Sequence, residues 1–384
     1  MKKTIYYWSP CLDKVGTVKS TLNSAIAVSK FSDDYKVKII NVFGEWEDFK
    51  DTFKKHDVEI IDLNFNYHKY LPRKGFIYSR LSYLVIIMLS VIPFFFLLKK
   101  DKPEILVAHL ITSLPLILFN IFNFNTKLVL RISGFPKLNY LRKKLWNLSS
   151  RYLHRITCPT LELLNKLKEE KIFPRDKLFH LQDAIIDINE FQSKINDKNF
   201  LPEIDLNRKY FLSIGRLSRQ KNFSYLINEY EDFLKNFNEW DLLIIGDGEE
   251  KKKLENLINS KNLENKVFLI SSTDNVYKYM QNATLFILPS LWEEVGFVIV
   301  EAALSNLFII SSNCPNGPSE FLDNGNSGIL FKSNVPGELK KSLDFYFKNT
   351  KDLEIKKIKT KKNSLKYTRF RHYLTLEKIL NNNL

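Results

Sequence analysis

A glycine, an arginine and a lysine follow one apolar segment in the second half of the chain. The segment Tyr210–Ile214 has the composition of a buried strand, and it runs directly into Gly215, Arg216 and, five residues after the arginine, Lys221. A glycine at a strand end lets the backbone approach a ligand closely. An arginine and a lysine on such a loop and at the start of a helix can converge on one diphosphate. The segment therefore predicts an anion site.

A pair of carboxylates follows a later apolar segment. Glu293 and Glu301 are separated by seven residues across an expected transition from strand to helix. The backbone N–H groups of Gly296, Phe297 and Val298 would lie at the N-terminus of that helix, where they and the helix dipole favour an anion. This second pattern also predicts a ligand site at a strand end.

The elements that must position these residues alternate between strand and helix, which is typical of parallel α/β domains. The expected strands of the first half are Thr4–Trp8, Val37–Phe43, Val58–Asp62, Ile105–Ala108 and Leu128–Ile132, with helices at Val18–Lys30 and Pro136–Leu153. The expected strands of the second half are Tyr210–Ile214, Asp241–Ile245, Val267–Ile270, Thr284–Leu288 and Phe308–Ser311. Ligands of such doubly wound sheets bind outside the carboxyl ends of the strands.

A chain of 384 residues exceeds what one hydrophobic core usually supports, so two domains are expected. The sequence places a first Rossmann-like domain at residues 1–190 and a second one at residues 191–365. Residues 366–384 are expected to form a C-terminal helix that packs back on the first domain. The predicted fold class is α/β, with two doubly wound domains that face each other across an interdomain cleft.

The two motifs, in this order and spacing, resemble the G-R-(x)4-K and E-x7-E signatures of the group 1 (family 4-like) glycosyltransferases, which are retaining enzymes of GT-B architecture. Further segments that resemble the family are Lys14–Thr17, His180–Asp187, Gly246–Gly248, and Asn316–Phe321 followed by Gly325 and Gly328. The resemblance extends from about residue 4 to residue 335, and its most specific motifs lie between Tyr210 and Gly328. The pattern is similar to enzymes of bacterial surface polysaccharides.

The resemblance implies that the first domain, residues 1–190, lies on the acceptor side and that the second, residues 191–365, binds the nucleotide-sugar donor. It also implies a role for each matched residue. Arg216 and Lys221 would neutralise the donor diphosphate as the glycosidic bond breaks, without a metal ion. Glu293 would hydrogen-bond the hydroxyls of the transferred sugar, and Glu301 would hold the nucleoside ribose. Gly16 would let an N-terminal loop close over the phosphates.

The reaction that the resemblance implies is transfer of a sugar with retention of its anomeric configuration and without a protein nucleophile. The donor would be a UDP- or GDP-linked sugar, and the acceptor a glycan or lipid-linked glycan of a capsule or lipopolysaccharide pathway. No cofactor is expected. The alternatives among enzymes are a sugar-nucleotide epimerase and a phosphorylase of the same architecture. They need acid/base residues over the sugar or a pyridoxal-binding lysine, which the sequence does not place.

One position departs from the family pattern. Many members carry a His followed by Gly after the strand that corresponds to Leu128–Ile132, whereas Ser133 occupies that place here, before Gly134. His109, which follows the preceding strand, is either a substitute or a structural histidine. The acid/base chemistry beside the sugar therefore stays open.

The first acidic position is ambiguous by one residue, because Glu294 directly follows Glu293. The spacing to Glu301 favours Glu293.

The formal net charge of +15 calls for an anionic partner. Residues 131–177 hold twelve Lys and Arg but only four Asp and Glu. A nucleic-acid-binding protein is the alternative from another class, but the basic stretch lacks interleaved aromatic residues and no zinc-finger or RNP pattern occurs. A phosphorylated substrate and an anionic membrane surface are the expected partners.

The cysteines and the start of the chain favour a cytoplasmic protein. Cys11, Cys158 and Cys314 are scattered and form no C-x-x-C pair, which argues against disulfides and zinc. Met1-Lys2-Lys3 leads directly into the strand Thr4–Trp8, so no secretory signal is expected.

One segment complicates this interpretation. Leu81–Leu98 contains eighteen residues without a charge, at the lower limit for a membrane span. Pro93 interrupts it and both flanks are basic, so we expect a buried or membrane-dipping helix pair. A span would place the strands Thr4–Trp8 and Ile105–Ala108 on opposite sides of a bilayer. The expected location is peripheral, on the inner face of the cytoplasmic membrane.

Overall fold

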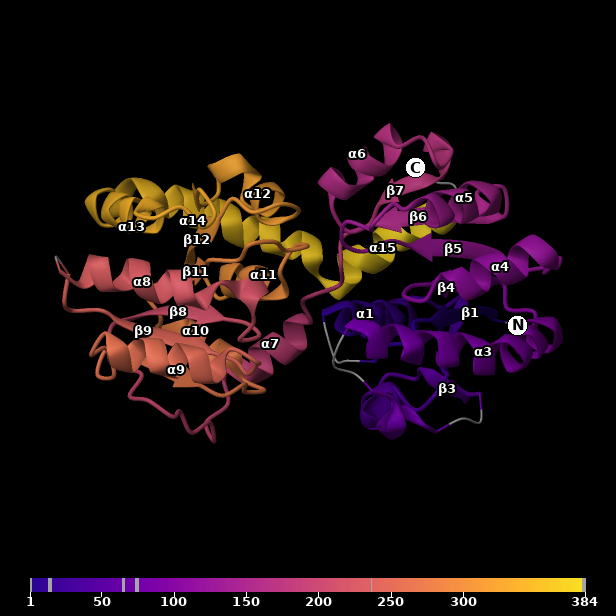
Figure 1. Ribbon diagram of the computed structural model, residues 1–384, viewed down its shortest axis with the longest axis horizontal. Helices are drawn as coiled ribbons and strands as arrows, with labels where there is room; N and C mark the ends of the chain where they lie inside the picture. Colours follow the sequence, from indigo (N-terminus) through magenta and orange to yellow (C-terminus); the bar gives the residue numbers. More distant parts are fainter. Residues whose placement is uncertain (1, 13–15, 64–65, 73–75, 236, 382–384) are drawn as a thin grey trace. The chain divides into compact units, whose positions relative to one another are not determined.

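The computed structural model describes residues 2–12, 16–63, 66–72, 76–235 and 237–381. The chain forms two compact units, of which one comprises Met1–Ile185 with Arg369–Leu384 and the other Ile186–Thr368. The last helix thus returns to the first unit, where it lies among the N-terminal elements (Figure 1). Each unit has its own sheet and is described by itself.

The first unit contains a seven-stranded sheet with the order β3-β2-β1-β4-β5-β6-β7, in which every pairing is parallel. Its strands are β1 (Lys3–Trp8), β2 (Tyr35–Asn41), β3 (Glu59–Asp62), β4 (Ile105–Ala108), β5 (Lys127–Arg131), β6 (Leu153–Cys158) and β7 (Leu178–His180). The strand order reverses between β1 and β4, so the carboxyl ends of these two strands form the topological switch point.

Helices cover both faces of this sheet (Figure 1). They are α1 (Gly16–Phe31), α2 (Lys50–Lys55), α3 (Phe76–Asp101), α4 (Ser113–Ile121), α5 (Tyr140–Ser149), α6 (Leu161–Glu169) and α15 (Arg369–Leu380). Tyr6 and Trp8 pack with α3, α4, α5 and α6. Ile5 and Tyr7 point to the opposite face and pack with α1, α2 and α15. Successive side chains of a strand point to opposite faces, which is why an apolar run such as β1 is buried on both.

The second unit contains a parallel six-stranded sheet with the order β10-β9-β8-β11-β12-β13. Its strands are β8 (Tyr210–Ile214), β9 (Asp241–Ile245), β10 (Val267–Ile270), β11 (Leu285–Leu288), β12 (Phe308–Ser312) and β13 (Ile329–Phe331). Its helices are α7 (Ile188–Ile195), α8 (Phe223–Leu234), α9 (Lys251–Ser260), α10 (Val276–Asn282), α11 (Phe297–Leu304), α12 (Pro318–Phe321), α13 (Glu338–Lys348) and α14 (Thr350–Ser364). The switch point of this sheet lies between β8 and β11.

Two predicted elements are corrected. The apolar segment around Pro93 is one helix, α3, and not a helix pair. A proline inside a helix removes one N–H···O bond, and the burial of Ile86 and Phe94 against the sheet holds both halves in line. The helix expected at Pro136–Leu153 is shorter, because the Asn139 side chain caps α5 by accepting from the Arg142 N–H (2.9 Å) and the chain enters β6 at Leu153.

Candidate functional site

The switch point of the second sheet collects the residues of both motifs. The loop with Gly215 and Arg216 leaves the carboxyl end of β8, and the loop from Ser290 to Gly296 leaves the carboxyl end of β11. β8 and β11 are adjacent strands, so the two loops lie side by side. Motifs about 70 residues apart therefore meet at the edge where doubly wound sheets bind ligands.

A buried ion pair joins the two loops. The Lys221 ammonium contacts Glu293 Oε1, and the side chains are only 14% and 6% exposed. The Ser290 hydroxyl donates a hydrogen bond of 2.7 Å to the same oxygen. No hydrogen bond to Glu293 Oε2 occurs among the residues that the structure describes. This cluster thus combines a cation with a carboxylate oxygen that can accept from a ligand hydroxyl.

Backbone contacts fix the loop that carries Glu293. The Leu291 N–H donates to the Gln220 carbonyl, and the Gln220 side-chain amide donates to the Trp292 carbonyl, both at 2.8 Å. On the other side, a Cβ at Gly317 would lie 1.3 Å from the Glu294 carbonyl oxygen. The loop is therefore held between the loops that follow β8 and β12.

The Gly246–Gly248 turn serves the packing of the loop after β8. A Cβ at Gly246 would lie 1.9 Å from the Gly215 carbonyl oxygen, and one at Gly248 would lie 2.2 Å from that of Leu217. The Leu217 N–H donates to the Asp247 carbonyl at 2.8 Å. These two glycines let the backbone of one loop lie directly on the other.

The helix α11 begins beside Glu293. Gly296 stands at its N-terminal boundary with φ of +77°, a conformation that favours glycine. Phe297 and Val298 follow in the first turn, where the N–H groups have no acceptor within the helix. Glu301 lies about one turn further along and is half-buried. The structure thus places these predicted donor-site residues on one helix start.

Glu293 and Glu294 have different surroundings. Glu293 is the residue in contact with Lys221 and Ser290, whereas Glu294 is half-buried and contributes its carbonyl oxygen to the close approach of Gly317.

The structure does not bring Arg216 to this cluster. The Arg216 side chain is 58% exposed and pairs with Glu249 at 3.2 Å. Lys221, five residues later, is turned inward by its contact with Glu293. The expected convergence of the two cations is therefore absent from this arrangement of the described residues, and Arg216 would have to leave Glu249 to meet a ligand beside Lys221.

A buried thiol, Cys314, lies close to this site. Burial is the main cause that raises the pKa of the Cys314 thiol, to about 11, so that it stays protonated at neutral pH. No group of three or more His, Cys, Asp or Glu with the geometry of a metal site occurs in the described ranges.

The first unit holds a second group of predicted residues at its own switch point. His109 directly follows β4, and its ring lies between two hydroxyls: Nδ1 is 2.9 Å from Thr21 Oγ1, and Nε2 is 2.9 Å from Ser133 Oγ. Thr21 Oγ1 also donates to Ser9 Oγ, directly after β1, at 3.1 Å. With the imidazole proton on Nδ1, the ring donates to Thr21 and accepts from Ser133. The two alternatives for the missing family histidine, Ser133 and His109, thus contact each other.

The His109 imidazole is neutral. Burial, with a further effect of the Arg131 charge, lowers its pKa to about 3, against a smaller opposite effect of Asp183. The backbone beside it is strained, because Leu110 and the β-branched Ile111 have φ of +49° and +39°. Such strain is often concentrated at functional sites.

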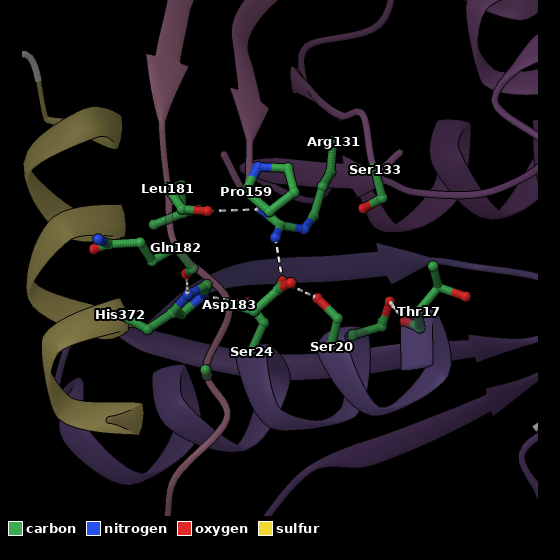
Figure 2. Close-up of polar contacts among 12 residues, drawn as sticks. Thr17, Ser20, Ser24, Arg131, Ser133, Pro159, Leu181, Gln182, Asp183 and His372 are labelled. Atoms are coloured by element: carbon green, nitrogen blue, oxygen red, sulfur yellow. Dashed lines mark hydrogen bonds and ion pairs between the residues drawn. The ribbon is translucent and has the colours of Figure 1, made fainter. Parts of the chain in front are cut away.

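A buried cluster that the sequence analysis did not identify lies next to this group (Figure 2). Arg131, at the end of β5, pairs with Asp183, which also accepts from the Ser20 hydroxyl. His372 of α15 lies on the other side, where its Nδ1 donates to the Gln182 carbonyl at 2.6 Å. The cluster fastens the segment that leaves the first unit to α1 and α15. The signal in the sequence was Asp183 itself, an acid within the apolar segment Leu181–Ile186.

The N-terminal glycine loop is described in part. Gly16 is exposed and is the first residue of α1, and a Cβ there would meet no atom within 4 Å. Packing within the described residues therefore does not require a glycine at this position. Lys14 and Val15 lie outside the described residues.

Comparison with known proteins finds a family that the second unit resembles. Residues 194–363 match the family model described as glycosyl transferases group 1. An uncharacterized glycosyltransferase of Methanocaldococcus jannaschii is 29% identical over 59% of this chain and 59% of its own length. The N-acetylgalactosamine-N,N'-diacetylbacillosaminyl-diphospho-undecaprenol 4-alpha-N-acetylgalactosaminyltransferase of Campylobacter jejuni is 26% identical over 54% and 57%. The chain thus spans just under three fifths of the length of these curated relatives.

Solved structures resemble the whole chain. HepE of Anabaena, crystallised in complex with UDP, has a TM-score of 0.76 at 16% identity, over 99% of this chain and 100% of the other. This likeness confirms the predicted fold, a two-domain α/β protein of the GT-B type with Rossmann-like sheets.

Proposed function

We propose that this protein is a glycosyltransferase that moves a sugar from a nucleotide-sugar donor to a glycan acceptor, on the premise that its residues 194–363 belong to the group 1 glycosyl transferases. The observation that carries the proposal is the Lys221–Glu293 pair with Ser290 at the switch point of the second sheet. The UDP bound to the similarly folded HepE supports a nucleotide as part of the donor.

The residues fit the charge that develops during such a transfer. The C–O bond between the sugar and the diphosphate breaks, the acceptor oxygen bonds to the same carbon, and the acceptor proton leaves with the nucleoside diphosphate. The leaving diphosphate gains negative charge, which Lys221 and the first N–H groups of α11 would stabilise. Glu293 Oε2 would accept from hydroxyls of the transferred sugar, and Glu301 from the ribose.

The finer parts of the proposal follow the family resemblance. The anomeric configuration of the sugar is retained, and the acceptor attacks from the face that the diphosphate leaves. No metal ion takes part, because the lysine and the helix start neutralise the diphosphate. A lipid-linked glycan is the proposed acceptor class, supported by the diphospho-undecaprenol acceptor in the name of the Campylobacter jejuni relative.

A donor screen tests the proposal. The protein would be incubated with UDP- and GDP-linked sugars and the release of nucleoside diphosphate measured. Lys221→Ala should lower the release by roughly 10²-fold, on the scale of one lost electrostatic contact in a transition state. Lys253→Ala is the matched control, because Lys253 is an exposed lysine of the same unit that pairs with Glu250.

The outcomes distinguish the alternatives. EDTA should leave the rate unchanged. When a glycan acceptor is added, the anomeric configuration of the glycosylated product, measured by NMR, should match that of the donor. Release of a free sugar with an inverted ring carbon would indicate an epimerase instead. Full activity of both Lys221→Ala and Glu293→Ala would show that the site is elsewhere.

A further inference from the structure

Helix α3 has an exposed apolar outer face. Its buried side chains recur every fourth residue, and the helix packs by this inner face, with Phe94 stacked on Trp8 at a centroid distance of 4.2 Å. The outer face is apolar as well, with Met88, Ile92 and Phe96 exposed by 66%, 67% and 63%. The exposed apolar residues of α3 are Tyr78, Leu81, Tyr83, Leu84, Met88, Leu89, Ile92 and Phe96, and together they are called its outer face. A helix that is apolar on both sides is normally buried.

The neighbouring helix extends this surface. Ile117 and Ile121 of α4 are exposed, and so is Phe122 directly after it. The Phe122 ring lies 4.6 Å from that of Phe95 on α3, so the two helices present adjoining apolar side chains. A contiguous exposed apolar surface indicates an interaction site.

The part of the sequence that contains α3 and α4 is strongly basic. Residues 63–161 contain fifteen Lys and Arg but only two acidic residues, Asp101 and Glu104. Both acids are engaged, because Asp101 accepts from the Tyr6 hydroxyl at 2.7 Å and Glu104 pairs with Lys127 at 2.7 Å. Arg80, Lys99 and Lys100 lie on α3 itself and are exposed. The surface therefore complements an anionic partner that also accepts apolar side chains.

Among the segments that the structure describes, Arg80–Asp101 is the one long and apolar enough to cross a membrane by length and composition. Crossing would withdraw Ile86 and Phe94 from the core of the first unit. It would also separate α3 from β4, which begins at Ile105 and pairs with β1. A second copy of this chain is disfavoured as the partner of this surface. A twofold contact would bring the basic residues of one copy against those of the other, and like charges repel.

We propose that the outer face of α3, together with the end of α4, docks on an anionic phospholipid surface. The apolar side chains enter the boundary between headgroups and acyl chains, and the basic residues lie at the lipid phosphates. Helices of a parallel α/β unit run opposite to the strands, so the start of α3 lies toward the carboxyl edge of the sheet. If the proposed function holds, docking brings that edge to a lipid-linked acceptor.

Vesicle flotation of the full-length protein tests the docking. Vesicles of phosphatidylcholine alone would be compared with vesicles that also contain about 30% phosphatidylglycerol, at low and high salt. Wild-type protein should float with the anionic vesicles and be released by salt, because exposed charges are screened within about 10 Å at 0.1 M. The double variant Ile92→Gln/Phe96→Gln should bind at least tenfold more weakly. Leu201→Gln/Phe345→Gln is the matched control, since it replaces two exposed apolar residues of the other unit and should bind as wild type does.

Three outcomes would overturn the docking surface. The first is that wild-type protein does not bind anionic vesicles, and the second is that Ile92→Gln/Phe96→Gln binds them as strongly as wild type does. The third is that the protein resists alkaline extraction from native membranes, which would indicate a membrane span. A dimer that this variant abolishes, without vesicle binding, would show that a second copy covers the face. Nucleoside diphosphate release from the donor without acceptor should be unchanged in the variant. If the wild-type protein released no nucleoside diphosphate at all, that result would count against the proposed function and not against docking.

Discussion

Two adjacent carboxylates at the second switch point differ in what they touch. Glu293 is buried against Lys221 and Ser290, whereas the Glu294 carbonyl oxygen lies where a Cβ at Gly317 would be. Glu293→Gln keeps the size of the side chain but removes the charge that balances Lys221. We expect it to lower the turnover of the donor by 10-fold or more, with a smaller change in nucleotide affinity.

Glu294→Gln is the matched comparison and should retain most of the activity, because it leaves the contact between Lys221 and Glu293 in place. Steady-state kinetics of nucleoside diphosphate release with both variants would decide whether Glu293 or Glu294 is the first acid of the motif. If Glu294→Gln were the damaging change, the first acid of the motif would be Glu294.

His109 predicts a specific dependence of stability on pH. Its pKa is lowered to about 3 in the folded protein, mainly by burial. The unfolded chain takes up this proton below about pH 6.5, and the folded protein does not until about pH 3. The stabilisation is therefore fully present above pH 6.5 and is lost on acidification, by about 1.4 kcal/mol per pH unit.

Urea unfolding of wild type and His109→Gln between pH 7 and 4.5 tests this dependence. The stability of the variant should fall less steeply on acidification. Burial also raises the pKa of Glu45 to about 7, with the opposite effect on stability, and lowers that of His372 to about 4. These groups are common to both proteins and cancel in the comparison. Parallel pH profiles would contradict a buried neutral His109.

At the scale of elements, the loop after β12 positions the loop after β11. Gly317 has φ of +117°, and a Cβ there would overlap the Glu294 carbonyl. Gly325 also has a positive φ, +91°, but a Cβ there would meet no atom within 4 Å. Gly325→Ala should therefore cost only the backbone strain, about 1–2 kcal/mol. Gly317→Ala should cost more in urea unfolding and should also reduce activity, because Glu293 moves with the loop. Equal costs would show that the contact is not needed.

The sequence predicted strands well where they are apolar and buried. Ile105–Ala108 has the predicted bounds, whereas β6 (Leu153–Cys158) was missed because His154 and Arg155 give it a polar character. Arg155 Nε donates to the Ile379 carbonyl at 2.9 Å, so its partner belongs to a helix more than 200 residues away. No local pattern reveals such a partner. β7 and β13 have only three residues each, too few for periodicity.

The candidate site was predictable to the extent that its residues follow strand ends. Lys221 and Glu293 belong to motifs that directly follow apolar strands in the sequence, and in the structure the two side chains form an ion pair. Ser290 was not identified, since a serine at a strand end has many structural roles. The inward turn of Lys221 and the outward turn of Arg216 were also not predictable, because both depend on acids, Glu293 and Glu249, brought in by other loops.

At the scale of the whole molecule, the first unit is built from both ends of the chain. α15 packs on α1 and buries Tyr373, Leu376, Ile379 and Leu380 in the core of that unit. Each such side chain contributes about 1.5–3 kcal/mol when buried. The sum is comparable to the total stability of a typical domain, about 5–15 kcal/mol. The last helix is therefore part of the first unit's fold, although 183 residues of the second unit precede it.

Weakening α15 should destabilise the first unit and leave the second one folded. Leu376→Ala should cost about 2–5 kcal/mol, because it opens a cavity between α15 and the first sheet. Lys378→Ala, on the exposed side of the same helix, is the matched control and should cost little. Hydrogen exchange would separate the units: amides of α1 and β1 should lose protection in Leu376→Ala, while those of β8 and β9 keep theirs. Equal loss of protection in both sheets would show that the two units unfold as one cooperative structure.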